Sequence, residues 1–294
     1  MAGRKKRLEW LHQFVFVGPA LFFFSMIVMI PFILSVYYSF TSWNGVSSLK
    51  PWVGFENFYS ILFQDSGFHN SFWFTLRFTA AQVVLTNVVG FGLALMLTQA
   101  LKSRNLLRTA FFMPNVIGGL LLGFIWQFIF VKGFASVGKI TGIGFFELPW
   151  LGDAPTAFWG IVIVSVWQGA GYVMVIYITG LMNVPKEIRE AALIDGATRW
   201  GMLRSITIPL IMPAITVCLF LTISWAFKMF DLNLSLTKGG PFNSTESVAL
   251  NIYQEAFRNN RLGLGTAKAT LFFIAVALIT LIQVKYTKNR EVES

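Results

Sequence analysis

The sequence predicts an all-α integral membrane protein with six transmembrane helices, and three observations carry this prediction. Of the 294 residues, 55% are hydrophobic and only 12% are charged, whereas soluble domains carry about 25% charged residues. Several apolar stretches are longer than the ~20 residues that a helix needs to cross a bilayer. Lys and Arg residues fall mainly in alternate loops between these stretches, as they do in multi-pass membrane proteins.

Six apolar stretches are long enough to span the membrane. We expect them at residues 14–38, 72–97, 107–131, 157–182, 206–227 and 266–284. Pro114 lies inside the third of these spans, where proline bends a helix. Residues 132–156 are rich in glycine and are expected to form a loop outside the membrane.

An even number of spans places both ends of the chain on one side of the membrane. The two tails and the loops near 98–110 and 183–206 hold fourteen of the 23 Lys and Arg residues, whereas the three other loops hold seven. The preference for positive charge inside therefore predicts cytoplasmic termini. The expected layout is a tail at 1–13, a membrane domain at 14–284 and a second tail at 285–294.

Composition excludes several classes of function. The formal net charge of +10 is compatible with nucleic-acid binding, but cytoplasmic-loop cations explain it better in a multi-pass protein. Cys218 is the single cysteine, so neither an internal disulfide nor a cysteine-based zinc site is expected. No cluster of His, Cys or carboxylates lies at membrane depth. We therefore expect no catalytic residues, no bound cofactor and no metal in this chain.

The segment from Val184 to Pro213 is the one long polar interruption with helix-forming features of its own. Pro185 stands where a helix can begin, because its missing N–H would be unpaired there in any case. Asp195 and Gly196 should end this helix, and residues 197–204 can form a second short one. An exposed helix pair between two spans is suited to docking a protein partner.

This segment resembles the EAA loop of ABC importer permeases, a family of binding-protein-dependent, type I importers. The resemblance is carried by Glu190, Ala191, Ala192, Asp195, Gly196, Ala197, Ile206, Ile208 and Pro209. It implies a core of five helices preceded by an additional one, and a coupling loop at 184–205 that inserts into a cleft of a separate ATPase. Gly196 would permit the turn, and Glu190 would face the ATPase.

A second set of residues resembles the carbohydrate-uptake subgroup of these permeases, which includes maltose-like and glycerol-phosphate-like members. The set consists of Trp150-Leu151, Trp167, Asp231, Thr237, Gly239-Gly240-Pro241 and Ser244-Thr245. The resemblance implies a permease subunit for sugars or oligosaccharides in a bacterial-type plasma membrane. Its implied partners are a second homologous permease, two cytoplasmic ATPase subunits that bind ATP and Mg²⁺, and an extracytoplasmic solute-binding protein. The sequence departs from this subgroup at residues 263–265, where relatives commonly show an aromatic residue after the first glycine.

Two other functions remain open. A secondary transporter driven by an ion gradient is one, although no acidic residue lies in the middle of a predicted span and no internal repeat is apparent. A permease of the same family for glycerol phosphate or another non-sugar solute is the other, because the subgroup residues do not identify the ligand.

Polar residues at membrane depth are costly and are often functional. We predict a substrate pathway along Asn115, Gln168, Trp225, Lys228 and Asp231, because sugar sites combine aromatic faces with planar polar groups. Gln82 is a further polar residue at this depth. The alternative for each is a hydrogen bond between helices or an anchor at the membrane interface.

Residues Gly133 to Ile140 nearly match a phosphate-binding loop. The motif requires Ser or Thr after Lys139, to bind Mg²⁺, but position 140 is Ile. The stretch also follows a membrane helix rather than a strand. We therefore predict no nucleotide site here, so any ATP-derived energy must come from a partner.

Gly119 and Gly123 form a Gly-x3-Gly pair in the third span. Such pairs let two helices approach closely, since no side chain separates the backbones. The pattern predicts a packing surface and no chemistry.

Overall fold

The structure, a computed structural model, describes residues 15–99 and 101–289. Within these ranges it is helical, with one isolated β-bridge between Thr41 and Trp52. Five helical stretches there are long and apolar enough to cross a membrane: Val15–Tyr38, Ser66–Leu97, Gly119–Thr141, Ala154–Met182 and Leu262–Lys288. A sixth results if the bent pair Arg199–Leu210 and Met212–Phe227 is one span. The predicted fold class of six apolar spans is therefore confirmed.

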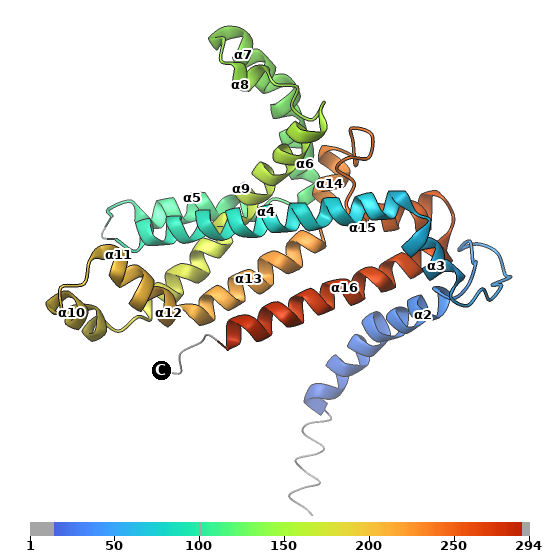
Figure 1. Cartoon of the computed structure of the whole chain (residues 1–294), viewed down its shortest axis with the longest axis horizontal. Helices are drawn as coiled ribbons and strands as arrows, with labels where there is room; N and C mark the ends of the chain where they lie inside the picture. The colour runs from blue at the N-terminus through green and yellow to red at the C-terminus, as the bar shows by residue number, and fades with distance from the viewer. Residues whose placement is uncertain (1–14, 100, 290–294) are drawn as a thin grey trace, which may run out of the picture. The chain divides into compact units, whose positions relative to one another are not determined.

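The α-helices that carry the argument are labelled in Figure 1. They are α2 (Ile30–Tyr38), α3 (Glu56–Phe63), α4 (Ser66–Leu97), α5 (Arg104–Val116), α6 (Gly119–Phe128), α7 (Phe134–Thr141), α8 (Gly144–Glu147), α9 (Ala154–Met182), α10 (Lys186–Ile194), α11 (Arg199–Met202), α12 (Ile208–Leu210), α13 (Met212–Phe227), α14 (Asp231–Leu236), α15 (Val248–Tyr253) and α16 (Leu262–Lys288). Short π-helical turns at 25–29, 129–133, 203–207 and 254–258 lie next to α2, α7, α12 and α15.

The chain forms two compact units. The first comprises the described residues up to Asp65 together with Ile252–Phe272, and the second comprises Ser66–Asn251 and the described residues from Phe273 onward. The first unit holds a buried lysine, Lys268, which is 1% exposed. Its ammonium lies 2.8 Å from a carboxylate oxygen of Asp65 and 2.7 Å from one of Glu255. Three segments of this unit therefore meet at one charged group.

The second unit is organised around α4, α9 and α13, which pack against one another, and α5 packs on α9 (Figure 1). Small residues allow these close approaches. A Cβ at Gly171 of α9 would collide with the backbone carbonyl of Phe111 in α5, and a Cβ at Gly90 would lie 2.8 Å from Val173. Aromatic and aliphatic side chains fill the remaining space in two buried clusters, one around Phe74 and Ile161 and one around Met174 and Cys218.

Two predicted spans are interrupted. The third was expected to run through 107–131, but α5 ends at Val116, and Ile117 and Gly118 are extended before α6 begins. The fifth, expected at 206–227, is bent by 72° at Ile211. Pro213 follows directly in the first turn of α13, where its missing N–H costs no hydrogen bond.

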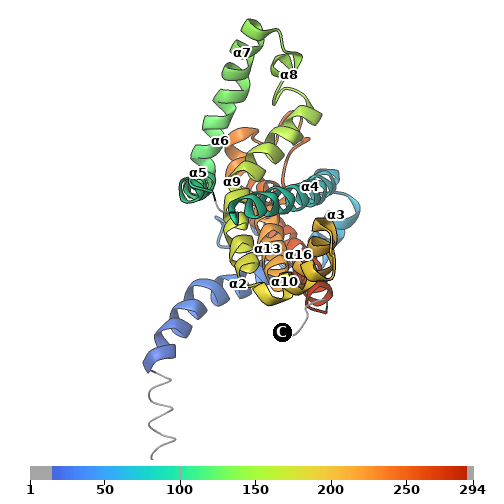
Figure 2. The same cartoon turned by 90° about the vertical axis from the view of Figure 1, so that its left-hand side faces the viewer.

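The segment 132–156 was expected to be a loop and is largely helical. The helix that begins with α6 continues through Thr141 as α7, and α8 returns beside it, so the two form an arm (Figure 2). Aromatic rings hold this arm together: Phe134 packs edge-on against Phe146, and Trp150 stacks on Phe130 with ring centroids 5.0 Å apart. Because α7 includes residues 134–140, the near match to a phosphate-binding loop lies in a helix rather than in a loop.

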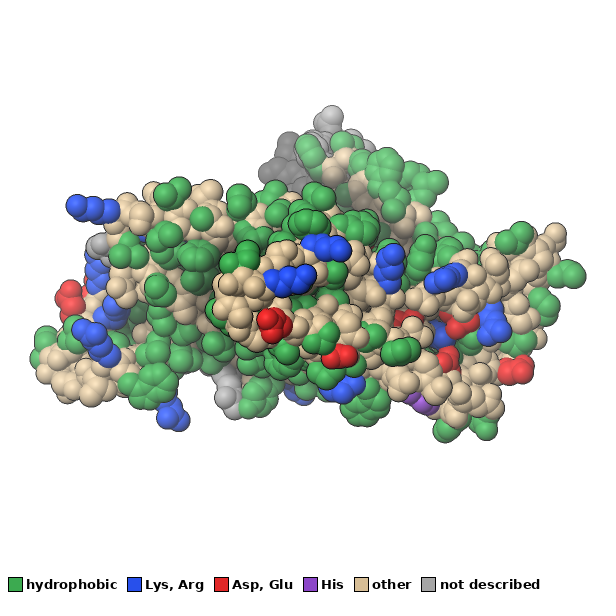
Figure 3. Space-filling view, turned by 90° about the horizontal axis from the view of Figure 1, so that it is seen from above, with side chains coloured by type: hydrophobic (Ala, Val, Ile, Leu, Met, Phe, Trp, Pro, Cys, Tyr) green, Lys and Arg blue, Asp and Glu red, His purple; other side chains and the backbone are tan. Residues whose placement is uncertain are grey.

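Hydrophobic side chains are widely exposed on the helices, and Figure 3 shows them spread over the face that it presents. Phe124 and Phe128 of α6 are 54% and 67% exposed, for example. Exposed apolar surface of this kind marks contact with lipid or with another protein. It agrees with the composition, from which a membrane protein was predicted.

Candidate functional site

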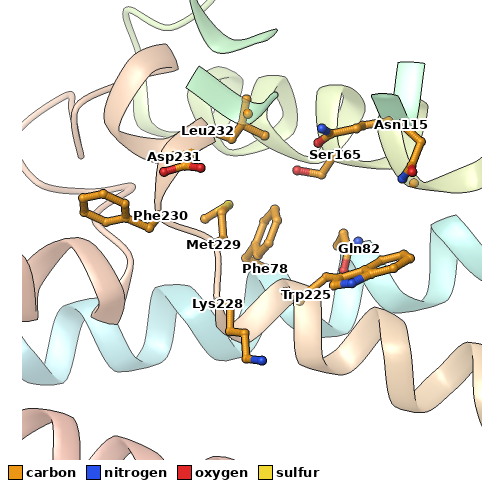
Figure 4. A pocket seen from close by; sticks show the side chains of 14 residues that line it. Phe78, Gln82, Asn115, Ser165, Trp225, Lys228, Met229, Phe230, Asp231 and Leu232 are labelled. Atoms are coloured by element: carbon orange, nitrogen blue, oxygen red, sulfur yellow. The ribbon is translucent and has the colours of Figure 1, made fainter. Parts of the chain in front are cut away.

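A cavity of about 390 Å³ lies inside the second unit, where α4, α9 and α13 converge on the start of α14. We call it the central cavity. Helix α13 ends at Phe227, and residues 228–230 turn the chain into α14, so this short link forms one wall. Asn115 of α5 and Gly119 of α6 complete the lining beside the break in the third span (Figure 4).

All five residues of the predicted substrate pathway line this cavity. They come from four parts of the chain: Asn115 from α5, Gln168 from α9, Trp225 from α13, and Lys228 and Asp231 from the link and the first residue of α14. The sequence separates Asn115 from Asp231 by more than a hundred residues, so the fold brings these groups together. Their role in binding a solute stays a prediction.

The chemistry of the lining is polar and aromatic. Trp225 presents its indole next to Tyr172, with ring centroids 5.2 Å apart in an edge-to-face arrangement. Lys228 and Asp231 are both exposed, and no ion pair between them is found among the described residues. One cation and one anion leave the cavity with no net charge, which suits an uncharged, hydrogen-bonding solute better than an ion.

Gln168 already has one partner. Its side-chain nitrogen Nε2 donates to the carbonyl oxygen of Ile117 at 3.0 Å. This carbonyl lies at the break between α5 and α6, where no helical N–H is available to it. The predicted alternative, a hydrogen bond between helices, therefore holds for the side-chain nitrogen of Gln168.

The structure adds residues that the predicted pathway omitted. Ser165 lies three residues before Gln168 on α9, and Phe78 lies four residues before Gln82 on α4. Residues three or four apart share one face of a helix. Helical spacing from Gln168 could therefore have identified Ser165, whereas only the tertiary fold shows that α4 reaches this wall.

Two glycines bring α14 onto α6 beside the cavity. A Cβ at Gly123 would collide with Ser235 Oγ, and a Cβ at Gly119 would lie 2.9 Å from the Cβ of Asp231. The predicted packing role of the Gly-x3-Gly pair is therefore confirmed, and the packed partner is a short helix of the same chain. This contact fixes where Asp231 enters the cavity wall.

Asn233 connects α14 to the loop that follows it. The side chain is fully buried, and its Nδ2 donates to Thr245 O at 2.7 Å and to Thr237 Oγ1 at 3.0 Å. Its Oδ1 accepts from the backbone N–H of Ser247 at 2.9 Å. Ser247 Oγ in turn donates to the carbonyl of Met229, a lining residue, at 2.8 Å. Asn233 thus links Thr237 and Thr245, two residues of the carbohydrate-subgroup set, into one hydrogen-bonded support for the cavity wall.

The 184–205 loop forms the helix pair that the sequence predicted. Helix α10 begins after Pro185 and ends at Ile194, and Gly196 takes a positive φ of 76°. Gly196 N donates to Leu193 O at 3.2 Å, and Ala197 N donates to Ala192 O at 2.9 Å. These two bonds are a Schellman motif, in which glycine is favoured at the left-handed position. The EAA-like residues are therefore spaced as the end of a helix and its glycine cap require: Ala192 lies in the last turn of α10, and Gly196 takes the left-handed position.

The same loop is highly exposed. Glu190, Ala191 and Asp195 are open to solvent, and Ala192 is buried. Apolar side chains are also exposed here: Leu193 is 65%, Ile194 86% and Trp200 67% exposed. A short helix with a charged face and uncovered apolar side chains is suited to contact with a protein partner.

Residues 87–290 match the family model described as binding-protein-dependent transport system inner membrane component. A probable starch degradation products transport system permease protein, AmyD of Thermoanaerobacterium thermosulfurigenes, is 48% identical over 279 residues, which cover 95% of this chain and 94% of that protein. The multiple sugar-binding transport system permease protein MsmF of Streptococcus mutans is 35% identical, over 89% of this chain and 90% of its own length.

Among solved structures, a chain of a bacterial ABC transporter involved in the import of the acidic polysaccharide alginate superimposes with a TM-score of 0.84. The match covers 98% of both chains at 20% sequence identity. At this identity the likeness establishes the fold alone, which is that of an ABC importer permease.

Proposed function

Because the chain belongs to the family of binding-protein-dependent transport system inner membrane components, we propose that it is a permease subunit of an ATP-driven importer of sugars or oligosaccharides. It is a multi-pass protein of the cell membrane and is not itself an enzyme. In this role the solute crosses the membrane with no covalent bond made or broken.

The observation that carries the proposal is the grouping of Asn115, Gln168, Trp225, Lys228 and Asp231 around one cavity. Trp225 offers an aromatic surface for the C–H face of a sugar ring, and the amides offer donors and acceptors for its hydroxyls. The absence of net charge among the lining side chains favours a neutral solute over an anion such as glycerol phosphate. The names of the two relatives point to saccharides as well.

Coupling to ATP is assigned to the 184–205 loop. The last turns of α10 and the turn that caps it contain the EAA-like residues Glu190, Ala191, Ala192, Asp195, Gly196 and Ala197. We infer that the 184–205 loop fits a cleft on a separate ATPase subunit, with Glu190 facing that subunit and Gly196 holding the turn. ATP and Mg²⁺ would bind to the ATPase, and this chain would bind no cofactor of its own.

The complete importer would contain further subunits. A second permease homologous to this chain, two ATPase subunits and an extracytoplasmic solute-binding protein make up the proposed assembly. Nucleotide binding would close the ATPase dimer and turn the permease pair outward, and hydrolysis would reset it. In this proposal the loop transmits the motion, and the two Schellman hydrogen bonds hold the end of α10 in its turn.

The test is co-purification of ATPase with tagged permease from detergent-solubilised membranes. Glu190→Lys reverses the charge of the proposed contact, and Gly196→Val places a β-branched residue at φ +76°, where it is strained. Gly142→Val is the matched control, because Gly142 also ends a helix at positive φ (+64°) but lies on the α7–α8 arm.

We expect wild type and Gly142→Val to retain the ATPase, and Glu190→Lys and Gly196→Val to lose most of it while remaining monodisperse. Proteoliposomes of the complete assembly should accumulate saccharide only with ATP. Solute uptake driven by an ion gradient without any ATPase would refute the proposal.

A further inference from the structure

A buried amide on the wall of the central cavity has no partner for its oxygen. Gln82 lies on α4 and is only 4% exposed, yet no hydrogen bond to its Oε1 is formed within the described structure. Buried acceptors are nearly always satisfied in folded proteins. An acceptor left unpaired at the edge of a cavity is therefore a place where the contents of the cavity donate the missing hydrogen bond.

The surroundings of Gln82 indicate what those contents are. Figure 4 shows Gln82 beside Trp225, with Ser165 and Asn115 on the opposite side of the cavity. An indole face, a serine hydroxyl and two amides recognise hydroxyl groups on a ring with apolar C–H faces. The charged lining residues, Lys228 and Asp231, belong to the link and to α14. The lining residues of α4, Phe78 and Gln82, are uncharged.

The other amides of the cavity are less well placed for this role. Gln168 has its nitrogen committed to Ile117 O, and Asn115 is only half-buried. An acceptor that is shielded from bulk water discriminates most strongly between a solute that donates and one that does not, because no water replaces the lost bond.

We propose that Gln82 is a specificity-determining residue, whose side-chain oxygen accepts a hydrogen bond from one hydroxyl group of a neutral saccharide in the central cavity. This inference rests on the proposed function, because it requires that the cavity hold the transported solute. Gln82 lies on α4, and none of the residues of the predicted substrate pathway lies on that helix.

The same helix face provides matched controls. Thr79 and Thr86 lie three residues before and four residues after Gln82 and are buried. Their hydroxyl oxygens also have no partner among the residues that the structure describes. Neither lines the central cavity. If unpaired polar atoms are simply a property of this face of α4, replacing Thr86 should have the same effect on solute selection as replacing Gln82.

The experiment compares wild type, Gln82→Met and Thr86→Val in the complete importer, reconstituted in proteoliposomes. Uptake is first measured for maltose, trehalose, cellobiose and sucrose, and for glycerol 3-phosphate and glucuronate as anions. The best neutral substrate is then presented as a series of analogues that each lack one hydroxyl. Methionine has nearly the length of glutamine and leaves no polar atom unpaired, so Gln82→Met should fold at least as well as wild type. Melting temperature and ATPase co-purification verify this.

We expect Gln82→Met to raise the KM of the parent saccharide roughly three- to tenfold, the range of one neutral hydrogen bond, with kcat little changed. One analogue should lose the same factor in wild type and lose nothing further in Gln82→Met. Thr86→Val should behave as wild type throughout the series.

Each of the following results would overturn the inference: an unchanged KM in Gln82→Met, equal losses for every analogue in both proteins, a preference of wild type for the anions, or the same losses in Thr86→Val as in Gln82→Met. In the first two cases the wild-type importer still carries sugar, and the proposed function stands. If the wild-type importer carries none of the saccharides although its ATPase is bound, the proposed function fails, and this inference fails with it.

Discussion

The side-chain nitrogen of Gln168 lies 3.0 Å from the carbonyl oxygen of Ile117, and this hydrogen bond joins α9 to the break in the third span. Replacing Gln168 with Leu leaves that carbonyl unpaired inside the membrane. Such a loss costs about 1–3 kcal/mol. We expect a lower melting temperature in detergent and slower solute uptake.

Gln127→Leu provides the comparison for this variant. Gln127 lies on α6, and its side chain forms no hydrogen bond within the described residues. The melting temperature of Gln127→Leu should therefore be close to that of wild type. Equal losses in the two variants would show that the bond to Ile117 contributes nothing measurable.

The contact between Gly123 and Ser235 predicts a steric effect. Gly123→Ala places a Cβ against Ser235 Oγ, so α14 must move away from α6 and carry Asp231 with it. Overpacking of this kind costs typically 1–3 kcal/mol. Melting temperature and uptake should both fall, and Ser235→Ala in the same chain should restore part of each.

Gly118→Ala tests whether any added methyl group in this region has that effect. Apart from its chain neighbours, no atom of the described residues lies within 4 Å of a Cβ at Gly118, and the φ of Gly118 is −61°. This variant should keep the stability and uptake of wild type. A loss comparable to that of Gly123→Ala would contradict the steric explanation.

The buried hydrogen bonds of Asn233 predict that this residue is needed for the cavity wall. Asn233→Ala removes bonds to Thr245, Thr237 and Ser247, each worth about 1 kcal/mol. The expected loss of stability is therefore about 3 kcal/mol, measured by thermal unfolding, with reduced solute uptake. Asn105→Ala, at an exposed site on α5, should leave both unchanged.

Asn233→Asp tests the two N–H donors of the Asn233 side chain separately from its oxygen acceptor. The carboxylate still accepts from Ser247 N but has no N–H to give to Thr245 O. We expect a stability loss at least as large as that of Asn233→Ala, because the N–H donors to Thr245 O and Thr237 Oγ1 are replaced by a buried negative charge. If this variant is as stable as wild type, the hydrogen bonds of Asn233 do not support the cavity wall.

Lys268 predicts an electrostatic effect in the first unit. Lys268→Met leaves the carboxylates of Asp65 and Glu255 without their shared cation. Removing one partner of a buried ion pair costs on the order of 3 kcal/mol. Thermal unfolding should show this loss, whereas Lys285→Met, at an exposed site on the same helix, should show none.

A second variant distinguishes charge from shape at this site. Lys268→Met combined with Glu255→Met removes one charge of each sign and leaves Asp65, whose side chain is 22% exposed to solvent. The double variant should regain part of the lost stability. If it is less stable than Lys268→Met alone, packing rather than charge holds the three segments together.

The elements that depend on local sequence were predicted well. Apolar runs longer than a bilayer is thick identified the spans, since nothing but lipid or protein can cover them. The end of α10 followed from Asp195 and Gly196, because a left-handed residue after a helix is a local requirement. The packing role of Gly119 and Gly123 was equally local.

The interruptions and the arm were not predicted, because tertiary contacts produce them. Ile117 can leave the helix since Gln168, 51 residues away, satisfies its carbonyl. The glycines of 132–156 suggested a loop, but Gly138 instead lets α7 approach the backbone at Phe146 closely. The pathway residues were predicted one by one from their polarity at membrane depth. Only the tertiary fold shows that they line one cavity.

The bend at Ile211 leaves α13 shorter than each of the five unbent apolar stretches that could span a membrane among the described residues. Its 16 residues extend about 24 Å at 1.5 Å per residue, less than the ~30 Å of a typical hydrocarbon core. The helix before the bend turns away by 72° and adds little length along this axis. A short span is accommodated by local thinning of the bilayer. We therefore expect bilayers of longer acyl chains to be mismatched most strongly with this segment, so that the thickness of the host membrane affects the transport cycle.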